Sequence, residues 1–309
     1  MSEFLCLPSC QEIEDAEMLL AKKGLHSNTL PIDNSTIFLK LDCQLPGGSY
    51  KIRGIEYFAS HYLNHAHPIK ILSAGNLALA AAIRLKENNV HCIAIVPEDI
   101  SHIKYQRLQS AGATIQKKSF SHLWELVQKH EIRQSPHFLH PFNKNLLTGY
   151  ATIVLEMKKA GFNQGTLVIP YGLGGLATAL AHAIEIFNLD IQLYLCEIAG
   201  FSPFKRALCA HYPVAGSKLK SFIEAMGTPI VITDVFHFLK ERIAGVIEVT
   251  EEEVKQEINT AFHRYNLRIE GAAGASLAGA RKLHSKNNIF TLLTGSNISD
   301  EIFQSIITN

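Results

Sequence analysis

The sequence predicts an α/β protein with two doubly wound domains built on parallel-type sheets, the smaller domain inserted in the larger one. Three observations support this fold. From about residue 68, short apolar runs alternate with longer amphipathic runs. The expected strands are apolar on both faces, as in Ile93-Ala94-Ile95-Val96, so helices should cover both sides of the sheet. An early apolar run at 38–41 belongs with the later strands, so the intervening unit is predicted to be an insertion.

The first series of alternating elements supplies the predicted small domain, residues 68–144. One of its apolar runs stops at Pro97, as expected where a strand ends. The expected strands are 69–72, 92–96, 113–116 and 138–139, and the expected helices are 77–87, 102–110 and 121–130.

The second series supplies the predicted large domain, residues 1–67 and 145–309. Residues 200–240 show no clear pattern, and no low-complexity linker separates the two series. The expected strands are 38–41, 166–169, 191–195, 245–249 and 289–293, and the expected helices are 152–159, 176–187, 251–265 and 272–284.

The composition is that of a globular protein of enzyme size. The 309 residues are 47% hydrophobic and 18% charged, which argues against disorder. The 29 basic and 28 acidic side chains are interspersed, so no nucleic-acid partner is expected. The N-terminus lacks the features of a signal peptide, and no apolar run is long enough for a membrane helix, so we expect a cytoplasmic protein without a membrane partner. The six cysteines form no CxxC pair and are expected to be free thiols.

A lysine follows the first of four loops that could bind ligands, since ligands of doubly wound sheets bind beyond the carboxyl ends of strands. This loop runs Pro46-Gly47-Gly48-Ser49-Tyr50-Lys51-Ile52-Arg53-Gly54 and leads into a helical stretch. A lysine kept away from bulk water loses its proton more readily, and its neutral amine can form a Schiff base. The alternative is an ordinary solvated lysine.

The second loop, Ser73-Ala74-Gly75-Asn76, lies between an expected strand and an alanine-rich helix. Its small residues allow close approach to the backbone, and free N–H groups at a helix start suit a carboxylate. Asn76 could instead be the N-cap of the helix, and the two roles do not exclude each other.

The third loop, Gly172-Leu173-Gly174-Gly175, joins an apolar strand to a helix. Backbone N–H groups and the helix dipole at such a loop favour a phosphate, whereas a tight turn alone would need only one glycine. The segment also fits the pattern GxGxxA, and Glu197 lies near the end of the next strand. A nicotinamide dinucleotide is therefore a rival ligand.

The fourth loop, Thr294-Gly295-Ser296-Asn297, precedes the last expected helix. Its hydroxyl groups could cap that helix or reach the nitrogen of a heterocycle. Taken together, a lysine, a carboxylate site, a phosphate site and a hydroxyl group at strand ends are what a phosphorylated aldehyde cofactor requires.

These loops, in this order, give the chain a family resemblance. It resembles the fold type II pyridoxal-phosphate enzymes, the tryptophan synthase β-like superfamily, and within it the serine/threonine dehydratase and serine racemase branch. The resemblance covers about residues 12–300. It rests on the four loops and on further segments: Leu39-Lys40-Leu41-Asp42; His140-Pro141-Phe142 through Gly149, Thr152-Ile153 and Glu156; and Glu270-Gly271-Ala272-Ala273-Gly274-Ala275.

The resemblance implies roles for the loop residues. Lys51 would bond the aldehyde of pyridoxal 5'-phosphate and later take the α-proton of the substrate. Asn76 would bond the ring hydroxyl, and Thr294 would face the pyridine nitrogen. The phosphate would bind to Gly172, Leu173, Gly174 and Gly175, and the substrate carboxylate to Ser73, Ala74, Gly75 and Asn76.

The implied reaction is the β-elimination of water from a small β-hydroxy amino acid, threonine or serine, giving a 2-oxo acid and ammonia. A neutral threonine at the ring nitrogen suits rapid elimination because it does not enforce a charged pyridinium. The resemblance also favours a homodimer.

Three residues depart from the pattern of the branch. Ala74 stands where racemase-type members resemble one another in placing a serine, which disfavours racemisation. Leu77 stands where a histidine is common, and Leu173 interrupts a loop that is often all glycine, so the loop is expected to be reshaped if this leucine takes a positive φ. No acidic residue close after Glu197 resembles the divalent-cation site of some relatives, so no metal is expected.

Several alternatives stay open from the sequence. The chain could catalyse another β-elimination, a β-replacement or a racemisation on the same fold. It could also bind the cofactor with degraded catalysis, which Leu77 and Leu173 suggest. A nicotinamide-dependent oxidoreductase, using Gly172 to Ala177 and Glu197, is the alternative of a different class.

Overall fold

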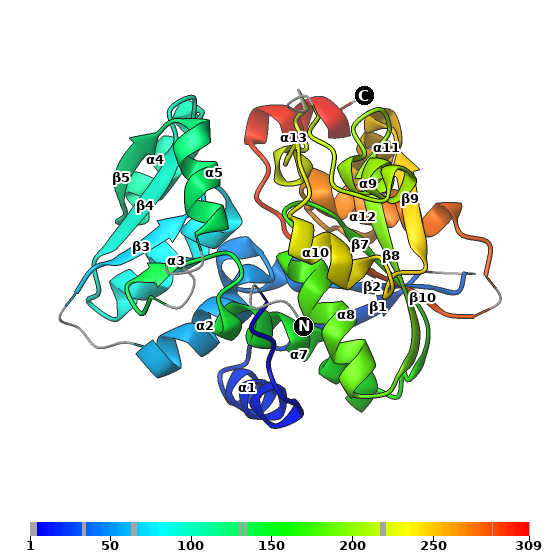
Figure 1. Cartoon of the computed structure of the whole chain (residues 1–309). Coiled ribbons are helices and arrows are strands. Elements are labelled where there is room, and N and C mark those ends of the chain that lie inside the picture. The colour runs from blue at the N-terminus through cyan, green and yellow to red at the C-terminus, as the bar shows by residue number, and fades with distance from the viewer. Residues whose placement is uncertain are drawn as a thin grey trace.

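Two separate sheets organise the chain. A computed structural model describes residues 5–32, 35–62, 67–129, 132, 135–216, 221–285 and 287–308. Within this part of the chain, the larger sheet has six strands in the order β1-β2-β10-β7-β8-β9, and the smaller has four in the order β5-β4-β3-β6. Figure 1 shows the small sheet with its helices on the left and the large sheet on the right. The predicted α/β class is confirmed.

The six-stranded sheet combines strands from distant parts of the sequence. Its edge strand β1 runs antiparallel to β2, and the other pairs are parallel. Strand β10 lies between β2 and β7, with Leu292 opposite Lys40 and Thr291 opposite Val168. The loops that follow these three strands therefore leave the same edge of the sheet side by side. The strands are β1 (Thr29–Pro31), β2 (Ile37–Lys40), β7 (Gln164–Pro170), β8 (Asp190–Ile198), β9 (Gly245–Val249) and β10 (Ile289–Leu292).

The four-stranded sheet is formed by a continuous stretch of chain between β2 and β7. All of its neighbouring strands are parallel, and β3 pairs with both β4 and β6. Its strands are β3 (Ile69–Leu72), β4 (Cys92–Pro97), β5 (Thr114–Lys118) and β6 (Phe138–Leu139), and its helices are α3 (Asn76–Glu87), α4 (His102–Ser110) and α5 (Phe120–Gln128).

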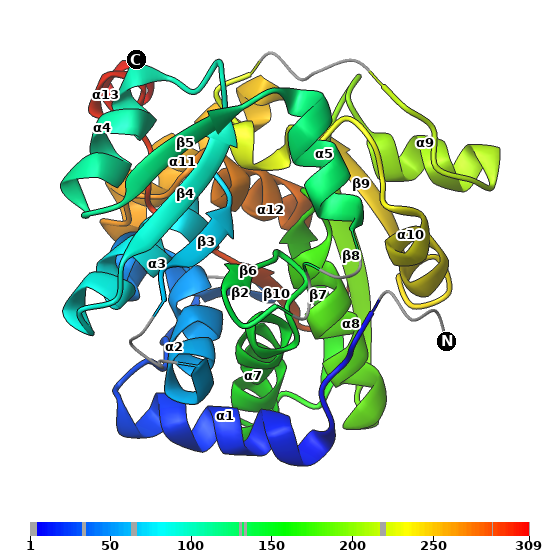
Figure 2. The same cartoon turned by 60° about the vertical axis from the view of Figure 1, so that its left-hand side comes forward.

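Apolar cores lie on both faces of the large sheet. On β7, Leu167 and Ile169 belong to one core and Val168 to the other, as the alternation of side chains along a strand requires. Figure 2 shows α1, α2 and α7 gathered below the sheets. The remaining helices are α1 (Cys10–Lys22), α2 (Lys51–Tyr62), α7 (Lys144–Lys159), α8 (Gly175–Ile186), α9 (Pro203–Ala210), α10 (Thr233–Leu239), α11 (Glu251–Tyr265), α12 (Gly271–Lys282) and α13 (Asp300–Ile307).

The structure extends or corrects several predicted elements. Helix α7 starts at Lys144 rather than near Thr152, because Asn143 caps it by accepting the backbone N–H of Asn145. The unassigned region 200–240 contains α9 and α10. Helix α5 ends at Gln128, and His130, the predicted last residue, lies outside the described residues. No helix among the residues with described coordinates is both long and apolar enough to cross a membrane.

Candidate functional site

Lys51 is the first residue of α2 and lies beside the loop 294–297. Two glycines with positive φ, Gly47 (75°) and Gly48 (68°), turn the chain just before it. The backbone N–H of Tyr50 then donates to the carbonyl of Thr294 at 3.0 Å, and the N–H of Ser296 donates to Gly48 at 2.9 Å. These bonds bring the predicted lysine and the predicted hydroxyl loop together, as the neighbouring strands β2 and β10 require.

The amine of Lys51 is held among aromatic rings. Its Nζ lies 4.5 Å from the ring centre of Tyr50 and 5.0 Å from that of Tyr150. Burial lowers the pKa of Lys51 to about 8, and the nearby charge of Glu270 opposes this shift. A substantial fraction of the amine is therefore neutral near physiological pH, as a nucleophile or base requires. Lys51 is half-buried, and its amine contacts two rings, which argues against an ordinary solvated lysine.

Helix α2 approaches α7 closely through two glycines. A Cβ added to Gly149 would lie 2.5 Å from the carbonyl oxygen of Arg53 and 2.5 Å from the Cα of Gly54. A Cβ added to Gly54 would lie 2.8 Å from the ring of Tyr150. The close crossing places Tyr150 beside Lys51. Tyr150 was not among the predicted site residues.

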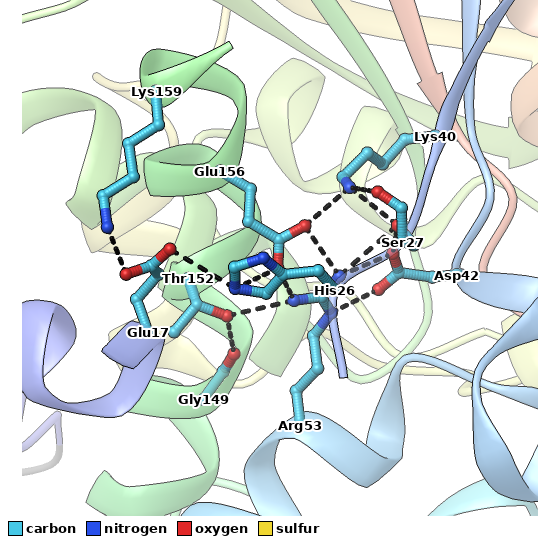
Figure 3. Close-up of polar contacts among 10 residues, drawn as sticks. All are labelled: Glu17, His26, Ser27, Lys40, Asp42, Arg53, Gly149, Thr152, Glu156 and Lys159. Carbon is cyan, nitrogen blue, oxygen red and sulfur yellow. Dashed lines mark hydrogen bonds and ion pairs between the residues drawn. The ribbon is translucent and has the colours of Figure 1, made fainter. Parts of the chain in front are cut away.

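A buried ion cluster fixes α2 just after Lys51 (Figure 3). Arg53 is completely buried and bonds Asp42 and Glu156 at once, and Lys40 Nζ bonds Glu156 Oε2 at 2.6 Å. Thr152 accepts from Arg53 Nη1 at 3.3 Å. We define the ion cluster as Lys40, Asp42, Arg53 and Glu156, which carry two positive and two negative formal charges. Its members come from β2, the turn after it, α2 and α7.

The charges of the ion cluster stabilise one another. Burial alone would raise the pKa of Asp42, but the Arg53 guanidinium outweighs it and holds the pKa below the usual value. Burial of Arg53 is likewise outweighed by Asp42 and Glu156, which raise the pKa of Arg53. Such a cluster costs desolvation energy but fixes geometry, because removing one partner leaves a buried charge unpaired.

Glu270 joins two of the predicted ligand loops. It is buried directly before α12, and its Oε1 accepts from the Thr294 hydroxyl at 3.1 Å. Its Oε2 accepts from Asn76 Nδ2 at 2.7 Å. Burial raises the pKa of Glu270, and the bonds from Asn76 and Thr294 and the charge of Lys51 offset part of that rise. Glu270 begins the segment 270–275 that contributes to the family resemblance, but the sequence predicted no role for it.

Asn76 is not the N-cap of α3. The cap position is Gly75, which has no side chain, and Asn76 is the first helical residue. The Asn76 amide reaches instead to Glu270 and to Asn297, whose Nδ2 donates to Asn76 Oδ1 at 3.0 Å. Thr294 is not a helix cap either, because Ser299 caps α13. Both side chains therefore bond Glu270 instead of capping a helix.

The glycine loop 172–175 follows β7, the strand next to β10. Gly174 has φ 105°. The φ of Leu173 is not positive, so Leu173 causes no backbone strain and the expected reshaping of the loop is not needed. The buried hydroxyl groups of Tyr171 and Thr178 find no hydrogen-bond partner among the described residues. Tyr171 precedes the loop, and Thr178 N–H donates to the Gly174 carbonyl.

The orphaned hydroxyl groups and the loop fit a bound phosphate ester. Buried polar groups are rarely left without partners, and the hydroxyl groups of Tyr171 and Thr178 could donate to the oxygen atoms of a phosphate at the loop. The hydroxyl of Ser49 is also buried and without a described partner, and it lies two residues before Lys51. The residues present thus fit a phosphorylated aldehyde, with donors at the glycine loop and an amine at Lys51.

Glu197 does not serve the rival dinucleotide. Its side chain is buried, with Oε1 accepting from the Phe204 N–H at 2.8 Å and Oε2 from the Lys205 N–H at 3.0 Å. Burial raises the pKa of Glu197 to about 7. Both oxygen atoms of Glu197 accept backbone N–H groups at the start of α9, so the carboxylate has a structural role. It is therefore not free to bind the ribose of a dinucleotide.

Known proteins are similar to this chain in sequence. The chain matches the family described as "Pyridoxal-phosphate dependent enzyme" over residues 25–295. It is 28% identical over 287 residues to the human L-serine dehydratase/L-threonine deaminase, covering 86% of this chain and 87% of that protein. It is 25% identical over 319 residues to serine racemase of Dictyostelium discoideum, covering 93% and 94%.

Solved structures show the same fold. The crystal structure of the Dictyostelium serine racemase superposes with a TM-score of 0.77 at 23% identity and covers 94% of this chain and 99% of that one. A pyridoxal 5'-phosphate-dependent aspartate racemase superposes with a TM-score of 0.80 at 18% identity, covering 96% and 98%. At these identities the structural likeness establishes the fold, and the family match, which spans most of the chain, establishes the cofactor. The chain belongs to the pyridoxal-phosphate dependent enzyme family, with the tryptophan synthase β-like fold and pyridoxal 5'-phosphate as its cofactor.

Proposed function

We propose that this enzyme is a lyase that removes water from a small β-hydroxy amino acid, threonine or serine, and yields a 2-oxo acid and ammonia. The observation that carries the proposal is the Lys51 amine, whose pKa is lowered to about 8 beside the loops to which we assign the ligand. The dehydratase and deaminase names of relatives at 26–28% identity support it.

Each loop receives one role in the proposal. The loop 172–175, with Tyr171 and Thr178, would hold the cofactor phosphate, and Asn76 and Thr294 would bond the ring hydroxyl and the ring nitrogen. Residues 73–76 would hold the substrate carboxylate through backbone N–H groups and the Ser73 hydroxyl. The Ser73 hydroxyl accepts from the Gly75 N–H at 3.2 Å, so the loop makes a tight turn directly before α3.

The proposed reaction needs a base that takes the α-proton of the substrate. When bound, the cofactor withdraws electrons from the α-carbon of the substrate. Lys51 Nζ, neutral in part, would take the α-proton, and Tyr50 and Tyr150 would exclude water around it. Loss of the β-hydroxyl as water would leave an enamine, which hydrolyses to the 2-oxo acid and ammonia.

Ala74 favours elimination over racemisation. Racemisation needs a proton donor on the face of the substrate opposite Lys51, and a methyl group at position 74 supplies none. The similarity to Dictyostelium serine racemase keeps racemisation as the second candidate function. A β-replacement would use the same base and the same loops. The backbone of Leu173 gives no support to a degraded phosphate loop.

The wider organisation is also part of the proposal. Residues 1–67 and 145–309 would form a large cofactor-binding domain, and residues 68–144 a small domain with the substrate-carboxylate loop. The two separate sheets support this division. We further propose a cytoplasmic homodimer without metal, nucleic-acid or membrane partners, as expected from the sequence.

An amino acid panel tests the function. The purified enzyme, loaded with cofactor, is incubated with L-threonine, L-serine and their D-isomers, and 2-oxo acid and enantiomer ratios are measured. We expect 2-oxo acid from L-threonine or L-serine and none from Lys51→Ala. Enantiomer formation without 2-oxo acid would favour racemisation, and undiminished turnover by Lys51→Ala would remove Lys51 from the mechanism.

A further inference from the structure

A chain of hydrogen-bonded side chains leads from the exposed surface of α4 into the site. Arg107 Nη2 donates to Asn297 Oδ1 at 3.1 Å, and Asn297 Nδ2 donates to Asn76 Oδ1 at 3.0 Å. Asn76 Nδ2 then donates to Glu270 Oε2 at 2.7 Å, and the Thr294 hydroxyl donates to Glu270 Oε1 at 3.1 Å. We call these five residues, Arg107, Asn297, Asn76, Glu270 and Thr294, the amide relay.

The amide relay joins the two sheets. Arg107 and Asn76 belong to α4 and α3, which accompany the four-stranded sheet, whereas Asn297, Glu270 and Thr294 lie in segments beside the six-stranded one. A displacement of the small sheet and its helices relative to the large one would therefore break bonds within the relay. Lys104, also on α4, adds a positive charge that acts on Glu270.

The direction of each bond that the two amides of the relay make is fixed. A guanidinium can only donate, so Asn297 must turn Oδ1 toward Arg107. Its Nδ2 then faces acceptors, namely the carbonyl groups of Gly47 at 2.8 Å and Gly48 at 3.3 Å and the Oδ1 of Asn76. Because Asn76 offers Oδ1 to Asn297, its Nδ2 must face Glu270. A reversed amide at either position would place two acceptors or two donors in contact.

We propose that Asn297 is a positioning residue that fixes the orientation of the Asn76 amide toward Glu270 and the cofactor ring, and that Arg107 makes this orientation depend on the position of α4. The proposal rests on the proposed roles of Asn76 at the ring hydroxyl and Thr294 at the ring nitrogen. Glu270 bonds both side chains, so the relay controls the hydrogen bonds at the two polar atoms of the ring together. Neither Asn297 nor Arg107 needs to touch the cofactor.

The substitution Asn297→Asp tests this with almost no change of shape. A carboxylate accepts from Arg107 but cannot donate to Asn76 or to the two glycine carbonyl groups. Either orientation of the Asn76 amide then places its Oδ1 against a carboxylate, at position 297 or at Glu270, so the amide loses its fixed orientation. We expect a changed ratio of the absorption bands of the lysine-bound cofactor and an affinity for pyridoxal phosphate that is weaker by roughly fivefold to tenfold, as for one lost hydrogen bond.

Two arginine variants complete the test. Arg107→Ala, at an exposed position that tolerates truncation, should shift the band ratio in the same direction but less, because the glycine carbonyl groups still orient Asn297. The matched control is Arg84→Ala. Arg84 also links the helices of the two sheets, through Nε to Glu56 Oε2 at 2.7 Å, but lies outside the relay. It should lower stability and leave the band ratio unchanged.

The outcomes separate the relay from the proposed function. Spectra and cofactor affinities of Asn297→Asp and Arg107→Ala equal to those of the unmodified enzyme would overturn the relay, and so would an equal spectral change in Arg84→Ala. An enzyme that shows the lysine-bound band but forms no 2-oxo acid would overturn the proposed reaction and leave the relay test intact. An enzyme without any lysine-bound band would overturn both.

Discussion

Arg53 and Asp42 form a two-point hydrogen bond in the interior, with Nε to Oδ2 at 2.7 Å and Nη2 to Oδ1 at 3.0 Å. Neither side chain has exposed surface. Because Arg53 follows Lys51 by two residues on the same helix, this pair fixes the direction in which α2 leaves the site. Planar two-point geometry is available to arginine and not to lysine.

We expect Arg53→Lys to destabilise the protein by about 3–5 kcal/mol, since Asp42 and Glu156 would lose bonds while remaining buried. The measurement is chemical denaturation of the cofactor-loaded enzyme. Arg242→Lys is the matched control, because Arg242 makes the same two-point bond to Glu185 at 2.8 and 3.1 Å near the surface. The control should cost under about 1 kcal/mol. Equal losses at the two sites would show that burial of the cluster does not matter.

Attachment of the cofactor to Lys51 should become faster as pH rises through about 8. Burial lowers the pKa of Lys51 to about 8, so the reactive neutral amine forms above that pH. The rate is measured by mixing cofactor-free enzyme with pyridoxal phosphate over pH 6–10, the range that brackets this pKa. A midpoint near 10.5, the ordinary value for lysine, would contradict the site geometry.

Glu270→Gln should move that midpoint below about 8. The negative charge of Glu270 raises the pKa of Lys51, so its removal leaves burial unopposed. The same mixing experiment detects the shift. Glu197→Gln serves as the control, because Glu197 is another buried carboxylate and bonds the start of α9 instead. An unchanged midpoint in Glu270→Gln would mean that the carboxylate does not act on the amine.

Gly174→Ala should weaken cofactor binding as well as stability. Gly174 has φ 105°, and an added Cβ would lie 2.7 Å from Val235 Cγ1 and 3.2 Å from the Tyr171 hydroxyl. Gly24 also has positive φ, 67°, but nothing lies within 4 Å of its added Cβ. Gly24→Ala should therefore cost only about 1–2 kcal/mol of backbone strain. Titration with pyridoxal phosphate distinguishes the two variants, and equal affinities would argue against the glycine loop as the phosphate site.

Ala74→Ser should introduce racemisation. A hydroxyl at this position would supply the missing proton donor on the face of the substrate away from Lys51. The expected result is slow formation of D-serine from L-serine, followed by chiral chromatography, with elimination retained. Ala78→Ser, four residues further along the chain and buried within α3, provides a control for the effect of an added hydroxyl near the loop. Racemisation at the same rate in both variants would refute the role of position 74.

The fold was predictable because its local patterns are strong. Apolar strands such as β4 and helices such as α11, with its Thr250 and Glu253 capping box, carry their signals within a few residues. Region 200–240 was not predictable, since α9 and α10 are short and are fixed by tertiary contacts, as when Glu197 bonds the start of α9. Helix α7 starts at Lys144 rather than near Thr152, and it contains Gly149, a residue of low helix propensity that is needed for the close crossing with α2.

The site was predictable in its loops but not in the residues that join them. Lys51, Asn76 and Thr294 follow strands and stand in recognisable segments. Glu270 and Tyr150 act through contacts with residues far away in the sequence, and no local pattern gives their partners. A carboxylate directly before a buried helix of small residues was the available signal for Glu270.

The position of β10 has a consequence for how the protein is made. This strand lies between β2 and β7, and the loop after it holds the segment that leads to Lys51. The ribosome therefore delivers the middle of the large sheet last, whereas the strands of the small sheet can pair much earlier. We expect a nascent chain stalled before residue 289 to protect the small sheet from proteolysis and to be unable to capture vitamin B6.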